Sequence, residues 1–181
     1  MKKVILIGGD LASLKSTIAQ RLSTDLSCIF LSKDRIKEVL GDAIETHTRE
    51  DNLRLSKATH KLMIQLAIEH VKVLDRLILE SNFKDHEMDE LNLVFKENDI
   101  QTLSVFLTGD MRILYDRFIA RQEQRHVVHQ STGFMSYETF LSSKRNFSLK
   151  RYGLDAILWD TTHFNDDDYH NLLTLIINKL S

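Results

Sequence analysis

The chain has 181 residues, a formal net charge of −2 and 43% hydrophobic residues. This length suits one globular domain with a sizeable core, and the charge gives no overall basic field of the kind that nucleic-acid binding needs. No apolar run approaches membrane-spanning length and no signal peptide is visible, so we expect a cytoplasmic protein. The single Cys28 excludes an intrachain disulfide, and we expect it to be a buried, inert thiol.

Short apolar runs alternate with longer stretches of helical period along the whole chain. Ser32 is expected to cap the second helix. The polar segment over 125–136 carries two histidines. In chain order we expect a strand over 3–8, a helix over 16–24, a strand over 27–31, helices over 33–40 and 50–72, a strand over 76–81, a helix over 85–98, a strand over 102–107, a helix over 111–124, a loop over 125–136, a helix over 137–149, a strand over 155–159 and a helix over 167–179.

This order predicts an α/β fold: a three-layer α/β/α sandwich around a five-stranded parallel sheet. We expect one domain over residues 1–181, with a small helical lid at about 117–137. Ligands of open α/β sheets bind where the carboxyl ends of the strands meet. The candidate motifs follow predicted strands and are therefore expected at that edge.

The stretch over residues 4–17 is the most specific motif in the chain. It matches the phosphate-binding pattern G-x-x-x-x-G-K-[ST], in which Gly9 is the first glycine, Lys15 the lysine and Ser16 the hydroxyl. Backbone N–H groups of such a loop, together with the following helix N-terminus, bind phosphates. We expect nucleotide binding by Gly9, Asp10, Leu11, Ala12, Ser13, Leu14, Lys15, Ser16 and Thr17. The alternative is an ordinary strand, turn and helix.

Leu14 stands where the pattern has its second glycine. If the loop needs a positive φ there, leucine costs about 1–2 kcal/mol of strain. Its side chain would then either crowd a phosphate or turn outward. A weakened nucleotide site and a different phosphate donor both fit this substitution, and restoring glycine is expected to strengthen ATP binding if the side chain strains or crowds the loop.

Two carboxylates follow predicted strands. Asp34 lies at the start of a helix, where it can act as general base toward a substrate hydroxyl or simply favour the helix dipole. Glu80 ends an apolar strand, where an acid is costly unless it is paired or linked to a metal. We expect Glu80, with the Ser16 hydroxyl, to hold Mg²⁺. The alternatives for Glu80 are a solvated strand end and a partner for a lysine.

Three arginines, Arg117, Arg121 and Arg125, are spaced to share one face of the predicted helix. They suit a lid that clamps transferring phosphates, with Arg121 and Arg125 catalytic and Arg117 on the nucleotide. A solvated helix face is the alternative. Arg125 is favoured among the three because it borders the loop.

The loop after these arginines carries His126 and His129. No cysteine or third histidine stands near them, which favours substrate contact or lid hydrogen bonds over a transition-metal site. Residues 160–162 follow the last predicted strand. They line the pocket of a nucleotide base, or they form a turn before an acidic helix start.

Together these residues resemble the small P-loop kinases of the nucleoside-monophosphate-kinase fold, in particular the zeta-toxin and chloramphenicol-phosphotransferase-like branch. The stretches that carry the resemblance are 8–17, 31–40, 78–83, 117–129 and 158–162. The resemblance implies ATP, Mg²⁺ and phosphoryl transfer to a hydroxyl of a small molecule. The chain departs from the family pattern at Ala12, Leu14 and Val127, where glycines and a proline are usual.

Two functions are therefore open. The first is an ATP- and Mg-dependent kinase acting on a small-molecule acceptor, which Asp34 and the arginines favour. The second is a non-catalytic nucleotide-binding or regulatory protein, which Leu14 favours. The sequence predicts no membrane partner, disfavours nucleic acid as a partner, and does not identify the acceptor or the oligomeric state.

Overall fold

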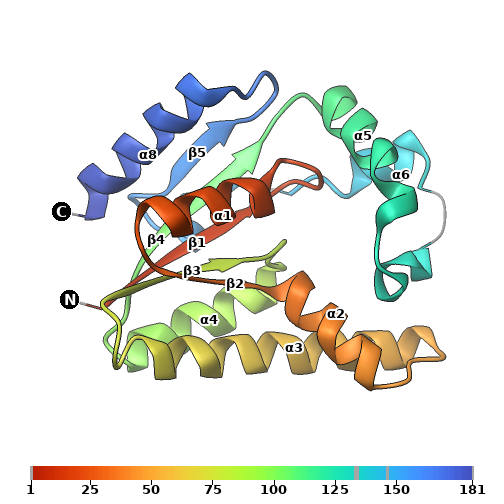
Figure 1. Ribbon diagram of the computed structural model, residues 1–181, viewed down its shortest axis with the longest axis horizontal. Helices are drawn as coiled ribbons and strands as arrows, with labels where there is room; N and C mark the ends of the chain where they lie inside the picture. Colours follow the sequence, from red (N-terminus) through yellow and green to blue (C-terminus); the bar gives the residue numbers. More distant parts are fainter. Residues whose placement is uncertain (1, 133–134, 146, 181) are drawn as a thin grey trace.

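A computed structural model describes residues 2–132, 135–145 and 147–180 (Figure 1). Its centre is one parallel sheet of five strands in the order β2-β3-β1-β4-β5. The expected five-stranded α/β fold is thus confirmed. The strands are β1 (Lys3–Gly9), β2 (Ile29–Ser32), β3 (Arg76–Glu80), β4 (Gln101–Thr108) and β5 (Ile157–Asp160).

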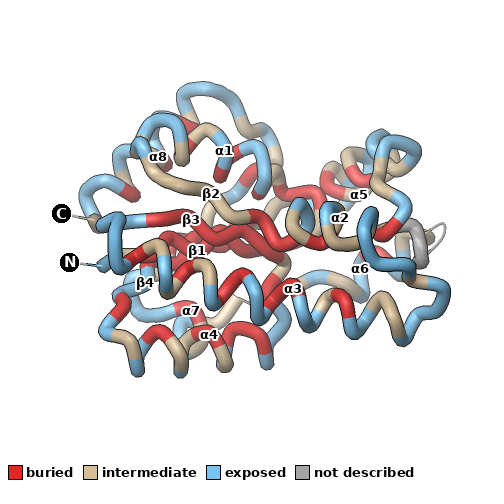
Figure 2. The backbone as a smooth tube through the Cα atoms, turned by 60° about the horizontal axis from the view of Figure 1, so that its bottom comes forward, coloured by how far each residue is buried: buried red, intermediate tan, exposed pale blue. Residues whose placement is uncertain are grey.

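Helices cover both faces of the sheet and continue beyond the carboxyl ends of its strands (Figures 1 and 2). None of them, in the part of the chain described, is both long and apolar enough to cross a membrane. They are α1 (Lys15–Asp25), α2 (Lys33–Ala43), α3 (Arg49–His70), α4 (Asp85–Glu97), α5 (Met111–Ala120), α6 (Tyr137–Ser142), α7 (Leu149–Tyr152) and α8 (Asp166–Leu180), with short 3-10 turns η1 (Gln122–Gln124) and η2 (Val127–Thr132).

The alternation of side chains along β1 divides the core between the two faces. Val4 and Leu6 pack with α3, α4 and α7, whereas Ile5 and Ile7 pack with α1 and α8. Because both faces are covered, β1 is apolar and buried on both sides, and Figure 2 shows this buried centre between the helical layers. The buried sheet provides the rigid edge that carries the loops.

A third, smaller apolar cluster lies beyond that edge. Phe118 of α5 and Phe140 of α6 pack with Leu114, and Ala12 of the loop after β1 joins them. The rings of Phe118 and Phe140 have centroids 5.4 Å apart. The helices that flank the predicted lid are therefore fixed to the phosphate-loop motif by apolar contact.

The predicted end positions of two helices are wrong. The helix expected over 111–124 ends at Ala120 and continues only as the 3-10 turn η1. The helix expected over 137–149 ends at Ser142, and a separate short helix, α7, starts at Leu149. The hydroxyls of Ser142 and Ser143 each donate to a carbonyl three residues back. Such local bonds compete with helix continuation.

Smaller differences concern helix and strand starts. Ser32 occupies the N-cap position of α2, but its hydroxyl makes no capping bond and donates to Glu80 instead. By contrast, Thr48 and Asp51 form a complete capping box at the start of α3. The second strand begins at Ile29 rather than 27, because Ser27 has a φ of 49° in the preceding turn.

Candidate active site

The loop that joins β1 to α1 begins at a position that only glycine can occupy. Gly9 has a φ of 132°, and a Cβ there would lie 2.0 Å from the carbonyl oxygen of Leu107. The backbone N–H of Asp10 then donates to that same carbonyl at 2.9 Å. The close approach of β1 to β4 thus directs the chain into the loop.

Two non-glycine residues of this loop take the left-handed conformation. Ala12 has a φ of 60° and Leu14 a φ of 62°, so the condition under which leucine strains this loop is met. The Leu14 side chain packs against the apolar cluster that contains α1 and α8. It therefore offsets part of its backbone strain by burial and does not turn outward.

Replacing Leu14 tests this balance. We expect Leu14→Gly to be more stable than Leu14→Ala by about 1 kcal/mol, because both lose the same packing and only alanine keeps the αL strain. Urea unfolding of the two variants beside the wild type measures the difference. An alanine variant as stable as the glycine variant would mean that the loop relaxes away from αL at no cost.

Lys15, the first residue of α1, lies inside the loop. Its side chain is 8% exposed, and its ammonium group donates to the carbonyl oxygen of Asp10 and, at 3.5 Å, approaches the hydroxyl of Ser13. Burial lowers the pKa of Lys15 to about 8, although the nearby carboxylate of Glu80 opposes this shift. The loop thus holds a desolvated cation that bound phosphates would stabilise.

The lowered pKa of Lys15 predicts that phosphate binding at this loop depends on pH. The free protein is expected to lose the Lys15 proton as the pH rises through about 8, whereas bound phosphates would keep the proton in place. The complex then holds more protons than the free protein, so affinity falls with rising pH, by at most about tenfold per unit. Calorimetric titration from about pH 7 to about 9.5 should show this decline; a constant Kd would contradict it.

Glu80 ends β3 beside the loop and accepts hydrogen bonds from two serines. The Ser32 hydroxyl donates to its Oε2 at 2.7 Å and the Ser16 hydroxyl at 3.3 Å. Burial raises the pKa of Glu80, while the Lys15 charge lowers it. This residue is therefore neither a solvated strand end nor half of a direct ion pair with a lysine.

Two neighbouring hollows lie beyond the phosphate loop and share Asp34, Arg125 and His129. The first, which we call the transfer pocket, has a volume of about 320 Å³. The second, which we call the acceptor pocket, has a volume of about 330 Å³, and its other lining residues are Leu11, Lys37, Arg49, Asn52, Leu53, Ser56, Asn82, Lys84, Phe118, Val128 and Met135. The other residues of the transfer pocket are Ser16, Ser32, Arg35, Glu38, Arg121, Gln124 and His126.

The structure places Asp34 where these two hollows meet. The residue lies in the first turn of α2 and is exposed. Ser16 of the phosphate loop faces the same transfer pocket, so the two predicted functional elements lie at one site. The sheet order explains this, because β2 and β1 flank β3 and all their carboxyl ends point to the same edge.

The three arginines do not share a helix face as predicted. Only Arg117 lies on α5, and its guanidinium donates to the carbonyl oxygens of Thr161 and Thr162, both at 2.8 Å. Arg121 and Arg125 follow the end of the helix and line the transfer pocket. The early end of α5 thus separates Arg117, which holds the segment after β5, from the two arginines at the pocket.

The histidines of the predicted lid contact α2. His126 Nε2 lies 3.0 Å from a carboxylate oxygen of Asp42, and His129 Nε2 lies 3.1 Å from one of Glu38. Of the two expected roles, substrate contact and hydrogen bonding, these contacts represent hydrogen bonding. No group of three or more metal-ligating histidine, cysteine or acidic side chains occurs among the residues described.

Several polar contacts at this edge have no signal in the sequence pattern. The Asp10 carboxylate, fully buried, accepts a hydrogen bond from the Thr108 hydroxyl at 2.7 Å and one from the backbone N–H of Arg145 at 2.8 Å. Asn52 of α3 donates to the Val128 carbonyl oxygen at 2.8 Å. The phosphate loop and the predicted lid are therefore held by residues from distant parts of the chain.

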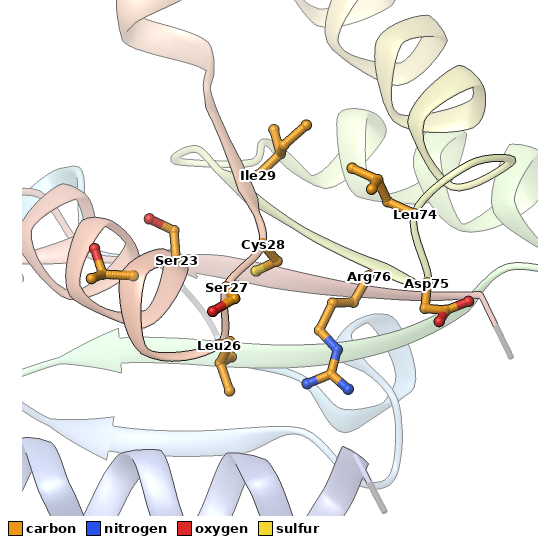
Figure 3. A pocket seen from close by; sticks show the side chains of 9 residues that line it. Ser23, Leu26, Ser27, Cys28, Ile29, Leu74, Asp75 and Arg76 are labelled. Atoms are coloured by element: carbon orange, nitrogen blue, oxygen red, sulfur yellow. The ribbon is translucent and has the colours of Figure 1, made fainter.

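A larger groove, of about 810 Å³, lies at the opposite edge of the sheet, around the starts of β2 and β3 (Figure 3). Leu26, Cys28, Leu74 and Arg76 are among its lining residues. Cys28 is only partly buried there, which corrects the expectation of a buried thiol. The groove contains none of the predicted site residues.

Comparison with known proteins identifies the fold. No protein-family model and no curated protein matches the chain. Solved structures do match: a candidate kinase from Chloroflexus aurantiacus has a TM-score of 0.81 at 21% identity and covers 99% of this chain and 96% of its own. Kti12 from Chaetomium thermophilum, solved with ADP-AlF3, has a TM-score of 0.69 at 13% identity. The match covers 98% of this chain and 99% of the Kti12 chain.

A third similar structure is the APS kinase CysC of Mycobacterium tuberculosis in complex with AMPPNP and APS. It has a TM-score of 0.64 at 15% identity, with 97% of each chain covered. At such identities the likeness concerns the fold alone. The chain therefore has the fold of P-loop kinases.

Proposed function

We propose that this protein transfers the γ-phosphoryl group of ATP to a hydroxyl of a small molecule, with Mg²⁺. The observation that carries the proposal is the meeting of Ser16, Asp34 and Arg125 at one hollow beside the phosphate loop. Similar proteins of this fold were solved with AMPPNP or ADP-AlF3, which supports ATP as the donor. The narrower resemblance to the zeta-toxin and chloramphenicol-phosphotransferase-like branch is part of this proposal.

The phosphate loop, residues 9–17, would bind the β- and γ-phosphates through its backbone N–H groups and Lys15. The hard oxygen atoms of Ser16 and Glu80, 3.3 Å apart, are of the kind that magnesium prefers, and these two residues would hold the ion. When bound, that ion neutralises charge on the transferring group.

In the reaction, the acceptor hydroxyl oxygen bonds to the γ-phosphorus, the bond from that phosphorus to the β,γ-bridging oxygen breaks, and ADP leaves. Asp34 takes the hydroxyl proton as general base. Arg121 and Arg125 stabilise the charge on the phosphoryl oxygens from the lid, residues 117–137. Arg117, bonded to the carbonyls after β5, would position the base of the nucleotide.

A direct assay tests the proposal. With Mg²⁺ and ATP labelled in its γ-phosphate, we expect the protein to label an organic compound in pools of hydroxylated metabolites. Chelation of Mg²⁺ by EDTA should reduce transfer to background, because the triphosphate charge is then uncompensated. Label released only as inorganic phosphate, or transfer that EDTA leaves unchanged, would contradict the proposal.

The second candidate function is nucleotide binding without catalysis. The strained conformation of Leu14, with a φ of 62°, is the observation that favours it. ATP binding by the wild type without transfer to any pool would support this regulatory role.

A further inference from the structure

We propose that the acceptor is a small hydroxylated compound that also carries an oxyanion, either a carboxylate or a phosphate, which the acceptor pocket binds. This inference rests on the proposed function for the reacting hydroxyl, but the pocket's charge stands on its own residues. Four cationic side chains line this pocket, and Asp34 is the single acidic residue among its described lining residues. The cationic residues are Lys37, Arg49, Lys84 and Arg125.

The positive charge is local to the pocket, since the whole chain has a net charge of −2. Two other cations on these helices contact carboxylates: Lys33 pairs with Glu87, and Arg54 of α3 pairs with Glu50 at 2.7 Å. The side chains of Arg49 and Lys84 have no such ion pair among the residues described, although both are exposed. Both side chains line the acceptor pocket.

Lys37 adds a cation inside the wall of the pocket. It is 8% exposed, and its ammonium group donates to the Asn52 Oδ1 at 2.5 Å, a neutral acceptor. Burial lowers the pKa of Lys37, the nearby Asp34 carboxylate opposes this shift, and the neighbouring cations add to it. A buried ammonium that is hydrogen-bonded to no carboxylate is costly, and an anionic ligand would offset that cost.

The shape and position of the pocket fit an acceptor. Apolar side chains such as Leu11, Phe118 and Val128 line the rest of it, which suits a carbon skeleton. Its volume of about 330 Å³ falls in the range of small-ligand sites. Asp34 lies at its boundary with the transfer pocket, so a ligand held by Arg49 and Lys84 would have its hydroxyl end toward that base.

The test uses the whole protein saturated with AMPPNP and Mg²⁺, so that the phosphate loop is occupied. Matched pairs of compounds are titrated into it: glycerate against glycerol, gluconate against glucose, and glycerol 3-phosphate as the phosphate arm. We expect anionic members to bind about tenfold or more tightly than neutral ones, as charge-assisted bonds do. Comparing glycerate and gluconate with glycerol 3-phosphate shows whether the pocket prefers a carboxylate or a phosphate.

The variants Arg49→Gln and Lys84→Gln should each weaken anion binding about tenfold. The control Arg54→Gln lies on the same helix outside the pocket and should leave binding unchanged. The inference would be overturned if neutral and anionic members of each pair bound equally, or if no anion bound. It would also be overturned if neither Arg49→Gln nor Lys84→Gln weakened anion binding. Failure of AMPPNP itself to bind would instead count against the proposed function. In that case, anion binding that depends on Arg49 and Lys84 would still support the charged acceptor pocket.

Discussion

Replacing Lys15 with alanine is expected to weaken ATP binding about 10- to 100-fold. The ammonium group is buried inside the phosphate loop, where its nearest partners are the Asp10 carbonyl and the Ser13 hydroxyl. A bound phosphate would gain charge-assisted bonds to it in a desolvated setting, each worth about 1.5–3 kcal/mol. Isothermal calorimetry with ATP and Mg²⁺ measures the loss.

The fold should survive this substitution. Alanine is a good helix former at the start of α1, and the change removes a charge whose burial is costly. Lys57→Ala, an exposed lysine on α3, is the matched control and should bind ATP like the wild type. Unchanged affinity in Lys15→Ala would show that this loop is not a phosphate site, provided that circular dichroism shows a native fold.

Sequence patterns predicted the sheet well because its determinants are local. Each strand is a short apolar run that ends in glycine or a polar residue, and β1, which is buried on both faces, is a continuous apolar run between Lys3 and two glycines. The spacing from Gly9 to Lys15 is likewise a local pattern. The pattern alone does not decide whether Leu14 takes a positive φ, and the structure gives a φ of 62° there.

The outer part of the site depends on contacts between distant segments, which no local pattern encodes. Where α5 ends decides that Arg117 binds carbonyls after β5 while Arg121 reaches the transfer pocket. The four cations of the acceptor pocket come from four segments, and Lys37, Arg49 and Lys84 are each unremarkable in their own segments. Only tertiary packing brings α2, α3, the loop after β3 and the segment after η1 together.

Replacing Asp34 with asparagine is expected to separate catalysis from binding. The carboxylate lies between the transfer and acceptor pockets rather than within the phosphate loop, so its loss should spare ATP binding. Removal of a general base typically lowers the rate about 10²- to 10⁴-fold. Asparagine keeps the size of the side chain and much of its hydrogen bonding, which limits other effects on α2.

Asp167→Asn is the matched control for Asp34→Asn. Asp167 is also an exposed acid in the first turn of a helix, α8, but it lines neither the transfer pocket nor the acceptor pocket. Both variants should lose about 0.3–1 kcal/mol of stability through the helix dipole, and only Asp34→Asn should lose transfer. The decisive comparison is ATP affinity beside phosphoryl-transfer rate in each variant. Loss of both in Asp34→Asn would assign Asp34 to Mg²⁺ or nucleotide binding, whereas retention of both would leave it a helix-terminal carboxylate without a catalytic role.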